Sequence, residues 1–330
     1  MSGKILVAGG AGYIGSHMLA CLKKNGMDVV VADNLCTGHA DAVKHGELLI
    51  GDVRDPAFLD DVFHKGDITG VIHFAAFSLV GESCKDPLKY YANNVTGAVE
   101  LLSAMHRHGV KNIVFSSTAA VYGEPEKQPI EETDRTLPTN PYGETKLAVE
   151  RMLRWCAEAY GIRYAALRYF NAAGADPDFG IGEDHSPETH LIPIVLDAAL
   201  GKRNHVGIFG NDYPTKDGTC VRDYIHVCDL ANAHLLALNY LENGGKSDVF
   251  NLGSGSGFSV LEIVEAARRV TGKDIPTKIE PRRPGDPSVL VASNDKAAKV
   301  LGWRPERTVI DDIIASAWEW KKAHPAGYGK

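Results

Sequence analysis

Short, continuously apolar runs alternate with amphipathic stretches along the first half of the chain. Helical periodicity falls between these runs, at about 12–25 and 88–108 and again at 142–160. Runs rich in valine and isoleucine are typical of strands buried on both faces of a parallel sheet. The pattern predicts βαβ units, and hence an α/β fold with a Rossmann-type, doubly wound parallel sheet. The runs are KILVAG (4–9), DVVVAD (28–33), ELLIGD (47–52), GVIHFAA (70–76), KNIVFSS (111–117) and IRYAALRYFN (162–171).

The pattern changes beyond about residue 172, where glycine, proline and aspartate become frequent. Long segments such as GADPDFGIGEDHSPETH and GNDYPTKDGTCVRDYIH separate amphipathic stretches near 190–201, 229–243 and 259–271. Loops of this length in a compact protein are usually functional. We expect residues 1–171 to form the Rossmann domain and residues 172–330 to form mainly a smaller, mixed α/β substrate lobe. Chain exchange between the two lobes is expected after residue 171.

Composition and charge narrow the class of partner. The 330 residues are 44% hydrophobic and 23% charged, as in an ordinary globular enzyme. A formal net charge of −7 without a basic run argues against nucleic acid and anionic membranes, and favours a small-molecule partner. The six cysteines form no C-x-x-C pair and no zinc-type cluster with histidine, so we expect reduced thiols and no metal site. With no signal peptide or long apolar stretch, we expect a cytoplasmic protein.

The stretch AGGAGYIGSH follows the first predicted strand and opens the first helix. Gly9, Gly12 and Gly15 fit G-x-x-G-x-x-G, and Gly10 with the latter two fits G-x-G-x-x-G. Such glycines allow a tight turn, close approach of a pyrophosphate and close packing of helix on sheet. Asp33 ends the second strand near the offset of about 20 residues at which an acid binds the adenosine ribose. No arginine follows it, so NAD is favoured over NADP.

One further acid and three hydroxyl residues lie at the ends of predicted strands. Asp52, in GDVRD, lies where an adenine amino group could bind, although it could equally belong to the N-terminal cap of a helix before Pro56. Ser116, Ser117 and Thr118 end the fifth strand, at the sheet edge where ligands bind in open α/β folds.

Tyr142 and Lys146, in PYGETK, are one helical turn apart and share a helix face. A phenol with a reference pKa near 10 is a poor base at neutral pH. An adjacent ammonium, together with a positively charged nicotinamide, would lower the pKa of the phenol. The pair is therefore predicted to act as a general acid/base, with a hydroxyl such as Thr118 hydrogen-bonding the substrate oxygen.

Motifs along almost the whole length resemble the extended short-chain dehydrogenases/reductases, and within them the UDP-glucose 4-epimerase family. The glycine pattern and Y-x-x-x-K point only to the superfamily, whereas IFGNDYPTKDGTCVRDYIHV with RRPGD points to the epimerases. Further matching stretches are DNL, GDVRD, VIHFAA, VGES, YYANNV, FSSTAAVYG, LRYFNAAGA, IGED and NLGSG.

The resemblance implies a mechanism in which NAD stays bound while a UDP-hexose is oxidised at carbon 4, turns over and is reduced from the other face. The implied activity interconverts UDP-glucose and UDP-galactose. By the same resemblance Tyr142 exchanges the proton of the 4-hydroxyl, Thr118 hydrogen-bonds the reacting oxygen, and Lys146 binds the nicotinamide ribose. Arg222 and Arg283 match phosphate-binding arginines, for which guanidinium geometry is well suited.

The resemblance also assigns the remaining site residues. The implied cofactor contacts are Gly9, Gly12, Tyr13, Ile14, Gly15, Asp33, Asn34, Asp52, Val53, Phe74, Ala75, Asn93, Ser116, Tyr142, Lys146 and Tyr169. The implied substrate contacts are Thr118, Asn171, His190, Leu191, Phe209, Arg222, Tyr224, Arg283, Asp286 and Leu290. For the aromatic residues among these, ordinary core packing is an alternative.

Three positions depart from the pattern of some family members. Ser78 replaces a lysine that binds the cofactor phosphates, and His190 replaces an asparagine near the substrate diphosphate. Leu290 occupies the position whose bulk governs admission of N-acetylhexosamines, and leucine is intermediate in size. UDP-GlcNAc and UDP-GalNAc are therefore further candidate substrates.

Several other functions share parts of this sequence pattern. A 4,6-dehydratase needs an acid and a base after the threonine, where this chain has Ala119 and Ala120. A net oxidoreductase, a 4-epimerase of UDP-pentoses or UDP-uronates, and a catalytically silent NAD-binding sensor remain alternatives. The resemblance further implies a homodimer through the helices at 88–108 and 142–160, although burial against the sheet would require similar apolar faces.

Overall fold

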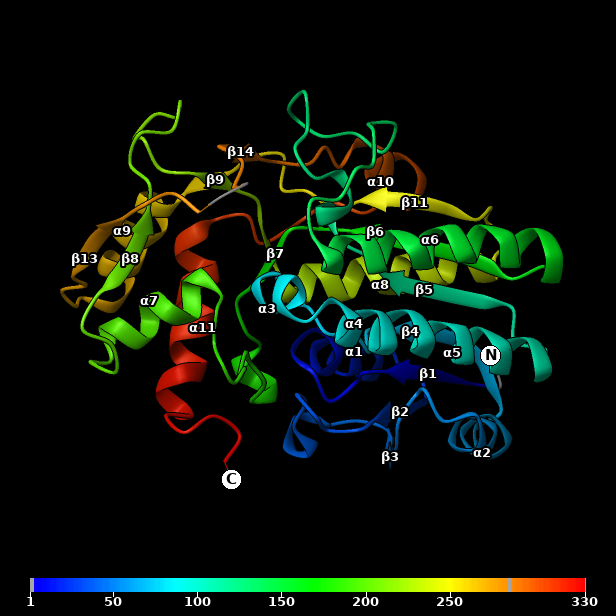
Figure 1. The fold of residues 1–330 in the computed structure, drawn as a ribbon. Helices are drawn as coiled ribbons and strands as arrows, with labels where there is room; N and C mark the ends of the chain where they lie inside the picture. Colours follow the sequence, from blue (N-terminus) through cyan, green and yellow to red (C-terminus); the bar gives the residue numbers. More distant parts are fainter. Residues whose placement is uncertain (1–2, 284–285, 330) are drawn as a thin grey trace.

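A computed structural model describes residues 3–283 and 286–329, and its largest feature is a seven-stranded parallel sheet (Figure 1). The strand order is β11-β6-β5-β4-β1-β2-β3, so the sheet is wound in both directions from β1 and the predicted Rossmann-type fold is confirmed. Its strands are β1 (Lys4–Ala8), β2 (Val29–Asp33), β3 (Glu47–Ile50), β4 (Ile68–His73), β5 (Asn112–Ser116), β6 (Arg163–Arg168) and β11 (Asp248–Asn251).

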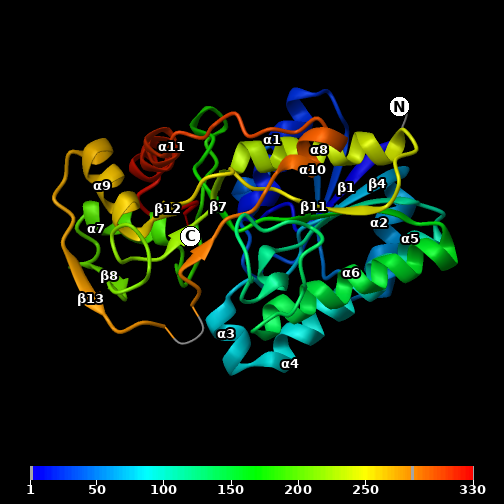
Figure 2. The same cartoon turned by 90° about the horizontal axis from the view of Figure 1, so that it is seen from above.

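Helices cover both faces of this sheet because successive strand residues point to opposite sides. Ile5 and Val7 of β1 face one core together with α1 (Tyr13–Lys24) and α8 (Val227–Glu242). Leu6 and Ala8 face a second core with α2 (Pro56–Gly66), α5 (Thr96–Arg107) and α6 (Pro141–Tyr160). The view from above shows these two helical layers on either side of the strands (Figure 2).

The helix expected at 88–108 is divided in the structure. It consists of α4 (Pro87–Tyr90), a π-helical turn η2 (Tyr91–Val95) and α5, and α3 (Val80–Lys85) precedes it. The helix considered as an alternative at Pro56 is present as α2, which begins at an Asp55 N-cap followed by proline. Short helical turns η1 (Ala40–Ala42) and η3 (Ala119–Tyr122) follow β2 and β5.

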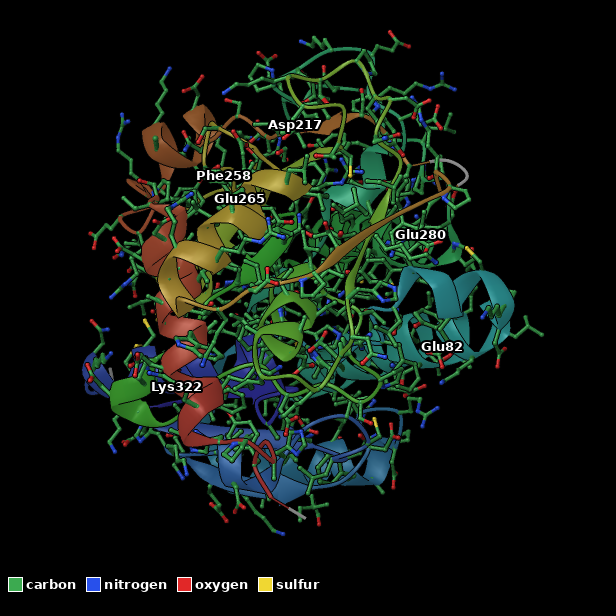
Figure 3. All side chains as sticks on the ribbon, turned by 90° about the vertical axis from the view of Figure 1, so that its left-hand side faces the viewer. Glu82, Asp217, Phe258, Glu265, Glu280 and Lys322 are labelled. Carbon is green, nitrogen blue, oxygen red and sulfur yellow. The ribbon has the colours of Figure 1, made fainter. Side chains whose placement is uncertain are left out.

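The second lobe is built from residues after β6, and Figure 3 views the molecule from this side. Its core gathers α7 (Leu191–Ala199), α9 (Val260–Thr271) and α11 (Ile310–Ala323). In Figure 3, Glu265 of α9 and Lys322 of α11 lie across the molecule from Glu82 of α3. The lobe also contains one short helical turn and seven short strands: η4 (Pro177–Phe179), β7 (Asn171–Ala173), β8 (Val206–Phe209), β9 (Val221–Arg222), β10 (Tyr224–His226), β12 (Phe258–Ser259), β13 (Thr277–Glu280) and β14 (Val289–Leu290). The helix α10 (Asp295–Val300) lies between β14 and α11 in the chain.

The chain passes between the lobes more than once. After β10 it returns to the Rossmann sheet as α8 and β11, and β11 pairs with β6 at the sheet edge. Trp303, beyond α10, is fully buried in the same core as α1 and α8. Within the described ranges, no helix is long and apolar enough to cross a membrane.

A buried hydrogen-bonded network fixes α6 against the sheet. Glu150 of α6 accepts hydrogen bonds from the Arg168 guanidinium, at 2.9 Å from Nε and 2.5 Å from Nη2. It also accepts one from Ser117 at the end of β5. Arg168 donates in turn to the Tyr122 hydroxyl, which donates to Asn251 of β11. The side chains of the Arg168–Glu150 pair are only 6% and 5% exposed. Each charge is therefore stabilised by its partner and not by water.

Breaking this pair is expected to destabilise the protein strongly. Glu150→Gln should lower the free energy of unfolding by about 3–5 kcal/mol, because Arg168 would remain charged and buried without its partner. Urea denaturation would measure the change. The matched control is Glu158→Gln, which removes the exposed Arg154–Glu158 pair on the same helix and should cost less than about 1 kcal/mol. Equal effects of the two variants would contradict this account.

Candidate active site

The glycine-rich turn between β1 and α1 is close-packed at some glycines and open at another. A Cβ at Gly15 would lie 2.2 Å from the Gly9 carbonyl oxygen, and Gly9 itself has a φ of +82°. By contrast, a Cβ at Gly12 would meet only that oxygen, at 3.4 Å. The fold therefore requires glycine at 9 and 15, whereas the bare backbone at Gly12 suits the close approach of a ligand such as pyrophosphate.

The N-terminus of α1 adds a positive potential at this turn. Gly12 is the N-cap and offers no side-chain cap to the first amides of the helix. Uncapped N–H groups and the helix dipole favour a phosphate group at this position. Asp33 at the end of β2 is fixed beside it, because its carboxylate accepts from the backbone N–H of Ala11 at 2.9 Å and of Leu35 at 2.9 Å. Burial raises the pKa of Asp33, and these two amides oppose the shift.

Asp52 lies next to Asn34 at the edge of this site. Its carboxylate receives hydrogen bonds from Asn34 at 3.0 Å and from Arg54, at 2.9 Å from Nε and 2.6 Å from Nη2. The Arg54 guanidinium holds the pKa of Asp52 well below its usual range. Asp55, and not Asp52, caps α2. The structure thus brings Asp33, Asn34 and Asp52 together, with Asp52 already paired to a cation.

The other predicted cofactor contacts surround the same turn. The amides of Phe74 and Ala75 donate to the Ala8 carbonyl, which holds the segment after β4 beside the glycines. Val53 is buried in the core shared with α2 and α5, whereas Ile14 packs against the core on the opposite face of the sheet. The Tyr13 hydroxyl donates to the Gly174 carbonyl at 2.6 Å, so this side chain links α1 to the second lobe.

Asn93 lies in the π-helical turn, where its amide donates to the side chain of Asn94. Asn94 is the more buried of the two and was not predicted. It bonds both backbone groups of Phe77 and the Thr145 hydroxyl of α6, at 2.8–3.1 Å. Ser78, in the same segment, is exposed.

Tyr142 lies in the first turn of α6, which starts at an Asn140 N-cap followed by proline. The backbone amide of Tyr142 donates to Ser83 of α3 at 3.2 Å. Burial raises the pKa of its phenol, and a hydrogen bond with the Thr118 side chain lowers it. Thr118 is buried and caps η3 by accepting from the Ala120 amide at 3.1 Å. The structure therefore brings the predicted acid/base and the predicted hydroxyl together.

Lys146 is buried one turn further along α6. Its ammonium donates to the Ser116 carbonyl at 2.7 Å and lies 4.9 Å from the ring centre of Phe115. Burial lowers the pKa of Lys146 to about 7, and the nearby Glu150 carboxylate opposes that shift. Burial of the Tyr142 phenol outweighs the bond from Thr118, so its pKa is raised. The predicted lowering requires the bound nicotinamide as well as Lys146, and it stays a prediction. Ser116 also contacts Tyr169, with 2.5 Å between the two hydroxyl oxygens.

Most of the predicted substrate residues lie on short strands and loops of the second lobe, and some of them contact each other. Arg222 of β9 donates to the Asp286 carboxylate, and it lies opposite Leu290 where β14 pairs with β9. The Arg283 guanidinium stacks on the ring of Phe209, 3.9 Å from its centre. An open pocket of about 710 Å³ is lined by Arg283 and Asp286. Residues 284 and 285 of the RRPGDP motif lie outside the described residues.

Asn171 and Tyr224 lie on the paired strands β7 and β10, directly opposite each other. The Asn171 amide donates to the Asp223 carbonyl at 3.0 Å, and Tyr224 is buried in the core of the second lobe. Leu290 is partly buried against the small core around η3, the helical turn that Thr118 caps. These positions connect the second lobe to the end of β5.

His190 caps the N-terminus of α7, next to Leu191. Its Nδ1 lies 2.7 Å from Glu183 and 3.1 Å from Glu188. Burial lowers the pKa of His190, but these two carboxylates outweigh burial and raise it to about 10. The predicted diphosphate contact is therefore engaged with two acidic side chains.

Sequence reasoning missed three buried charged residues that hold the predicted site residues in place. Glu150 and Arg168 fix α6, as described above. Asp223, between Arg222 and Tyr224, accepts from Ser254 at 2.9 Å and from the Ala292 amide at 3.1 Å. Two of them could have been identified from the sequence. Arg168 is a charged residue inside an apolar strand, YAALRYF, and Glu150 is an acid one helical turn after Lys146.

Comparison with known proteins identifies the family of this chain. The profile of the NAD dependent epimerase/dehydratase family matches residues 5–253. The UDP-glucose 4-epimerase of Halalkalibacterium halodurans is 59% identical over 324 residues, covering 98% of this chain and 97% of that protein.

Solved structures of UDP-glucose 4-epimerases are similar over the full length. One is 55% identical with a TM-score of 0.97, covering 99% of this chain and 100% of its own. The Brucella ovis enzyme, solved in complex with NAD, is 48% identical with a TM-score of 0.94, covering 96% of this chain and 98% of its own. The glycine turn and Asp33 fit such a cofactor, and the expected cofactor NAD is confirmed as that of the family. The chain belongs to the NAD dependent epimerase/dehydratase family and, within it, to the UDP-glucose 4-epimerases.

Proposed function

We propose that this protein interconverts UDP-glucose and UDP-galactose by oxidation and re-reduction at carbon 4 of the hexose. The observation that carries the proposal is the convergence of Thr118, Tyr142 and Lys146 at the carboxyl end of β5, beside the glycine turn. The names of its relatives support the same activity.

NAD, when bound, would supply the hydride acceptor and donor for the sugar. Tyr142 would take the proton of the 4-hydroxyl during oxidation and return it during reduction, and Thr118 would orient that oxygen. Lys146 is anchored on the Ser116 carbonyl, close to the expected nicotinamide side of the site. Its positive charge favours the phenolate, which burial alone disfavours.

Binding of a UDP-sugar would use Arg222 and Arg283 on the diphosphate. Both guanidiniums are held near the 710 Å³ pocket, one by Asp286 and one by the Phe209 ring. We infer that the substrate competes for these contacts, with Asp286 turning to the ribose and Phe209 to the uracil. A firm grip at this end leaves the 4-ketohexose free to present either face.

A dehydratase function is less well supported. Ala119 and Ala120 follow Thr118 in η3 and bear no acidic or basic group. The first offers only a buried methyl group and the second donates its amide to Thr118. Elimination of water would have no acid or base at this position.

In this proposal, the size of the Leu290 side chain decides whether N-acetylated sugars are accepted. Its side chain is partly buried, beside the core around η3. Leucine is smaller than an aromatic residue at this position, so we propose UDP-N-acetylhexosamines as second substrates. Conversion of UDP-GalNAc by the purified protein, offered separately from UDP-galactose, would support this proposal, and no conversion would refute it.

The proposed roles are tested by an assay of purified protein, without added NAD, for conversion of UDP-galactose to UDP-glucose. Tyr142→Phe should retain NAD and reduce turnover by about 10²–10⁴, the usual contribution of a proton-transfer group. Tyr160→Phe, which removes a hydroxyl from an exposed position on the same helix, should leave turnover within about twofold. Near-normal turnover of Tyr142→Phe would refute its role. No conversion by the wild type, even with NAD supplied, would redirect the search to UDP-pentoses and UDP-uronates.

The two glycines of the turn should respond differently to alanine. Gly12→Ala should keep the thermal unfolding midpoint of the NAD-free protein and weaken NAD binding at least tenfold, because its methyl group faces open space where pyrophosphate is expected. Gly15→Ala should lower the unfolding midpoint, since its Cβ would collide with the Gly9 carbonyl. Thermal unfolding and NAD titration would measure both effects. Wild-type NAD affinity in Gly12→Ala would contradict the assigned position of the phosphates.

We also propose a homodimer formed through the outer faces of α4, α5 and α6. These helices carry exposed apolar side chains, including Leu88 (78% exposed) and Trp155 (61% exposed). A hollow of about 490 Å³ on α6 is lined by Ala148, Arg151, Met152, Trp155, Cys156, Ala159 and Tyr160. An exposed apolar patch of this kind is typical of a protein–protein contact.

Trp155→Glu should convert the dimer to a monomer, since a buried unpaired carboxylate would oppose association. Light scattering on the eluting protein would give the mass. The control Val300→Glu alters an exposed apolar residue on α10 and should leave the mass unchanged. A wild-type protein that is monomeric at high concentration would refute the proposed dimer.

The cytoplasmic location stays a prediction.

A further inference from the structure

Four side chains in the loop before α7 converge on one point. Glu183, His185, Glu188 and His190 each contribute a potential ligand atom, and these atoms all lie within 4.8 Å of one another. The chain supplies them within eight residues, in the order E-x-H-x-x-E-x-H. This set comprises two imidazole nitrogens and two carboxylates, which is a common ligand set for transition metals.

The distances match those of a tetrahedral site. His190 Nδ1 is 2.7 Å from Glu183 Oε1 and 3.1 Å from Glu188 Oε1. His185 Nδ1 is 3.1 Å from Glu183 Oε1 and 3.8 Å from Glu188 Oε2. Ligands bound to zinc at about 2.0–2.1 Å in a tetrahedron are about 3.3 Å apart. Small side-chain movements would therefore complete the coordination.

The contacts do not divide into separate ion pairs. One oxygen of Glu183 faces the Nδ1 atoms of both histidines, and the Nδ1 of His190 faces both carboxylates. An imidazole Nδ1 carries at most one hydrogen, so it makes one good hydrogen bond. A shared central cation would satisfy all four ligand atoms together, whereas a protonated His190 satisfies only part of them.

The loop is held in place on both sides of Glu183. Gly182 exchanges hydrogen bonds with the Tyr328 hydroxyl, at 2.9 Å from its amide and 3.1 Å from its carbonyl. Asp184 accepts from the Tyr328 amide at 3.0 Å, and its own carbonyl oxygen is 3.0 Å from the His39 ring. A site whose ligands are fixed by surrounding contacts loses less freedom when it binds a metal.

Glu188 and His185 are also oriented. Glu188 Oε1 accepts from the backbone amides of Thr189 and His190, at 2.7 and 2.8 Å. The edge of the His185 ring packs against Tyr13, with the ring centres 6.2 Å apart. The His185 and His190 side chains are 25% and 39% exposed, so a cation can enter from solvent.

We propose that Glu183, His185, Glu188 and His190 bind a divalent transition-metal cation of the zinc class. Magnesium and calcium fit less well, because they take six or more oxygen ligands. The site lies between Tyr13, at the start of α1, and the first turn of α7, which carries His190 and Leu191. The metal would fix the loop that joins the cofactor side of the molecule to the substrate lobe. The proposal does not depend on the sugar substrate or on turnover.

The test measures metal in the NAD-loaded protein itself. After chelation and dialysis, zinc chloride would be titrated by calorimetry and the bound metal counted by mass spectrometry. We expect one zinc per chain and a higher thermal unfolding midpoint with zinc than with a chelator. His185→Gln and Glu188→Gln should each weaken zinc binding at least tenfold, as loss of a ligand or of its support does.

A surface cluster provides the matched control. His64 packs against His108, which contacts Asp60, so this cluster also combines histidines with a carboxylate. His64→Gln should leave the tight zinc site unchanged. Circular dichroism and retained NAD show whether each variant is folded. The proposal is overturned if the folded wild type takes up no stoichiometric zinc, or if its uptake is unchanged in both loop variants; the four side chains are then an ion-pair cluster only.

Discussion

The buried pair of Glu150 and Arg168 determines the position of the candidate active site. Glu150 lies one turn beyond Lys146 on α6, Arg168 ends β6, and Ser117 joins the pair from the end of β5. These three elements carry or adjoin Tyr142, Lys146 and Thr118. Because two opposite charges inside a protein tolerate little separation, α6 cannot slide along the sheet without exposing one of them to an apolar core. The spacing between the phenol, the ammonium and the strand-end hydroxyl follows from this constraint.

The two lobes contribute to the site in different ways. The Rossmann part presents backbone groups and short side chains at fixed positions, as at Gly12 and Asp33. The second lobe presents long side chains on loops, and Arg222 and Arg283 are held by neighbouring protein groups. Asp223 connects these regions, since it bonds the loops at Ser254 and Ala292 while its carbonyl accepts from Asn171. Under the proposed function, rigid recognition of the cofactor and adjustable recognition of the substrate would therefore be combined in one chain.

The parts that sequence predicted well are those set by local repetition or by close packing. Apolar runs indicated six of the parallel strands, because burial on both faces leaves little choice of residue type. The glycine turn and the Tyr142/Lys146 spacing were recognisable because backbone contact and helix geometry fix them. Side-chain partners in irregular segments were not predictable, whether they are near or distant in sequence. Such contacts depend on the directions of individual side chains, which no periodicity encodes. Examples are the pairing of Asp52 with Arg54, the pairing of Arg222 with Asp286, and the convergence around Glu183.

The route of the chain between the lobes also bears on how the protein is made. The first six strands of the sheet are complete by residue 168, but α8, which covers one face of that sheet, begins only at Val227. During synthesis the face that α1 shares with α8 therefore remains open until much of the second lobe has emerged. Non-local contacts of this kind slow folding and leave apolar surface exposed for longer. The nascent N-terminal half is thus a natural client for chaperones, and its stability belongs to the whole chain.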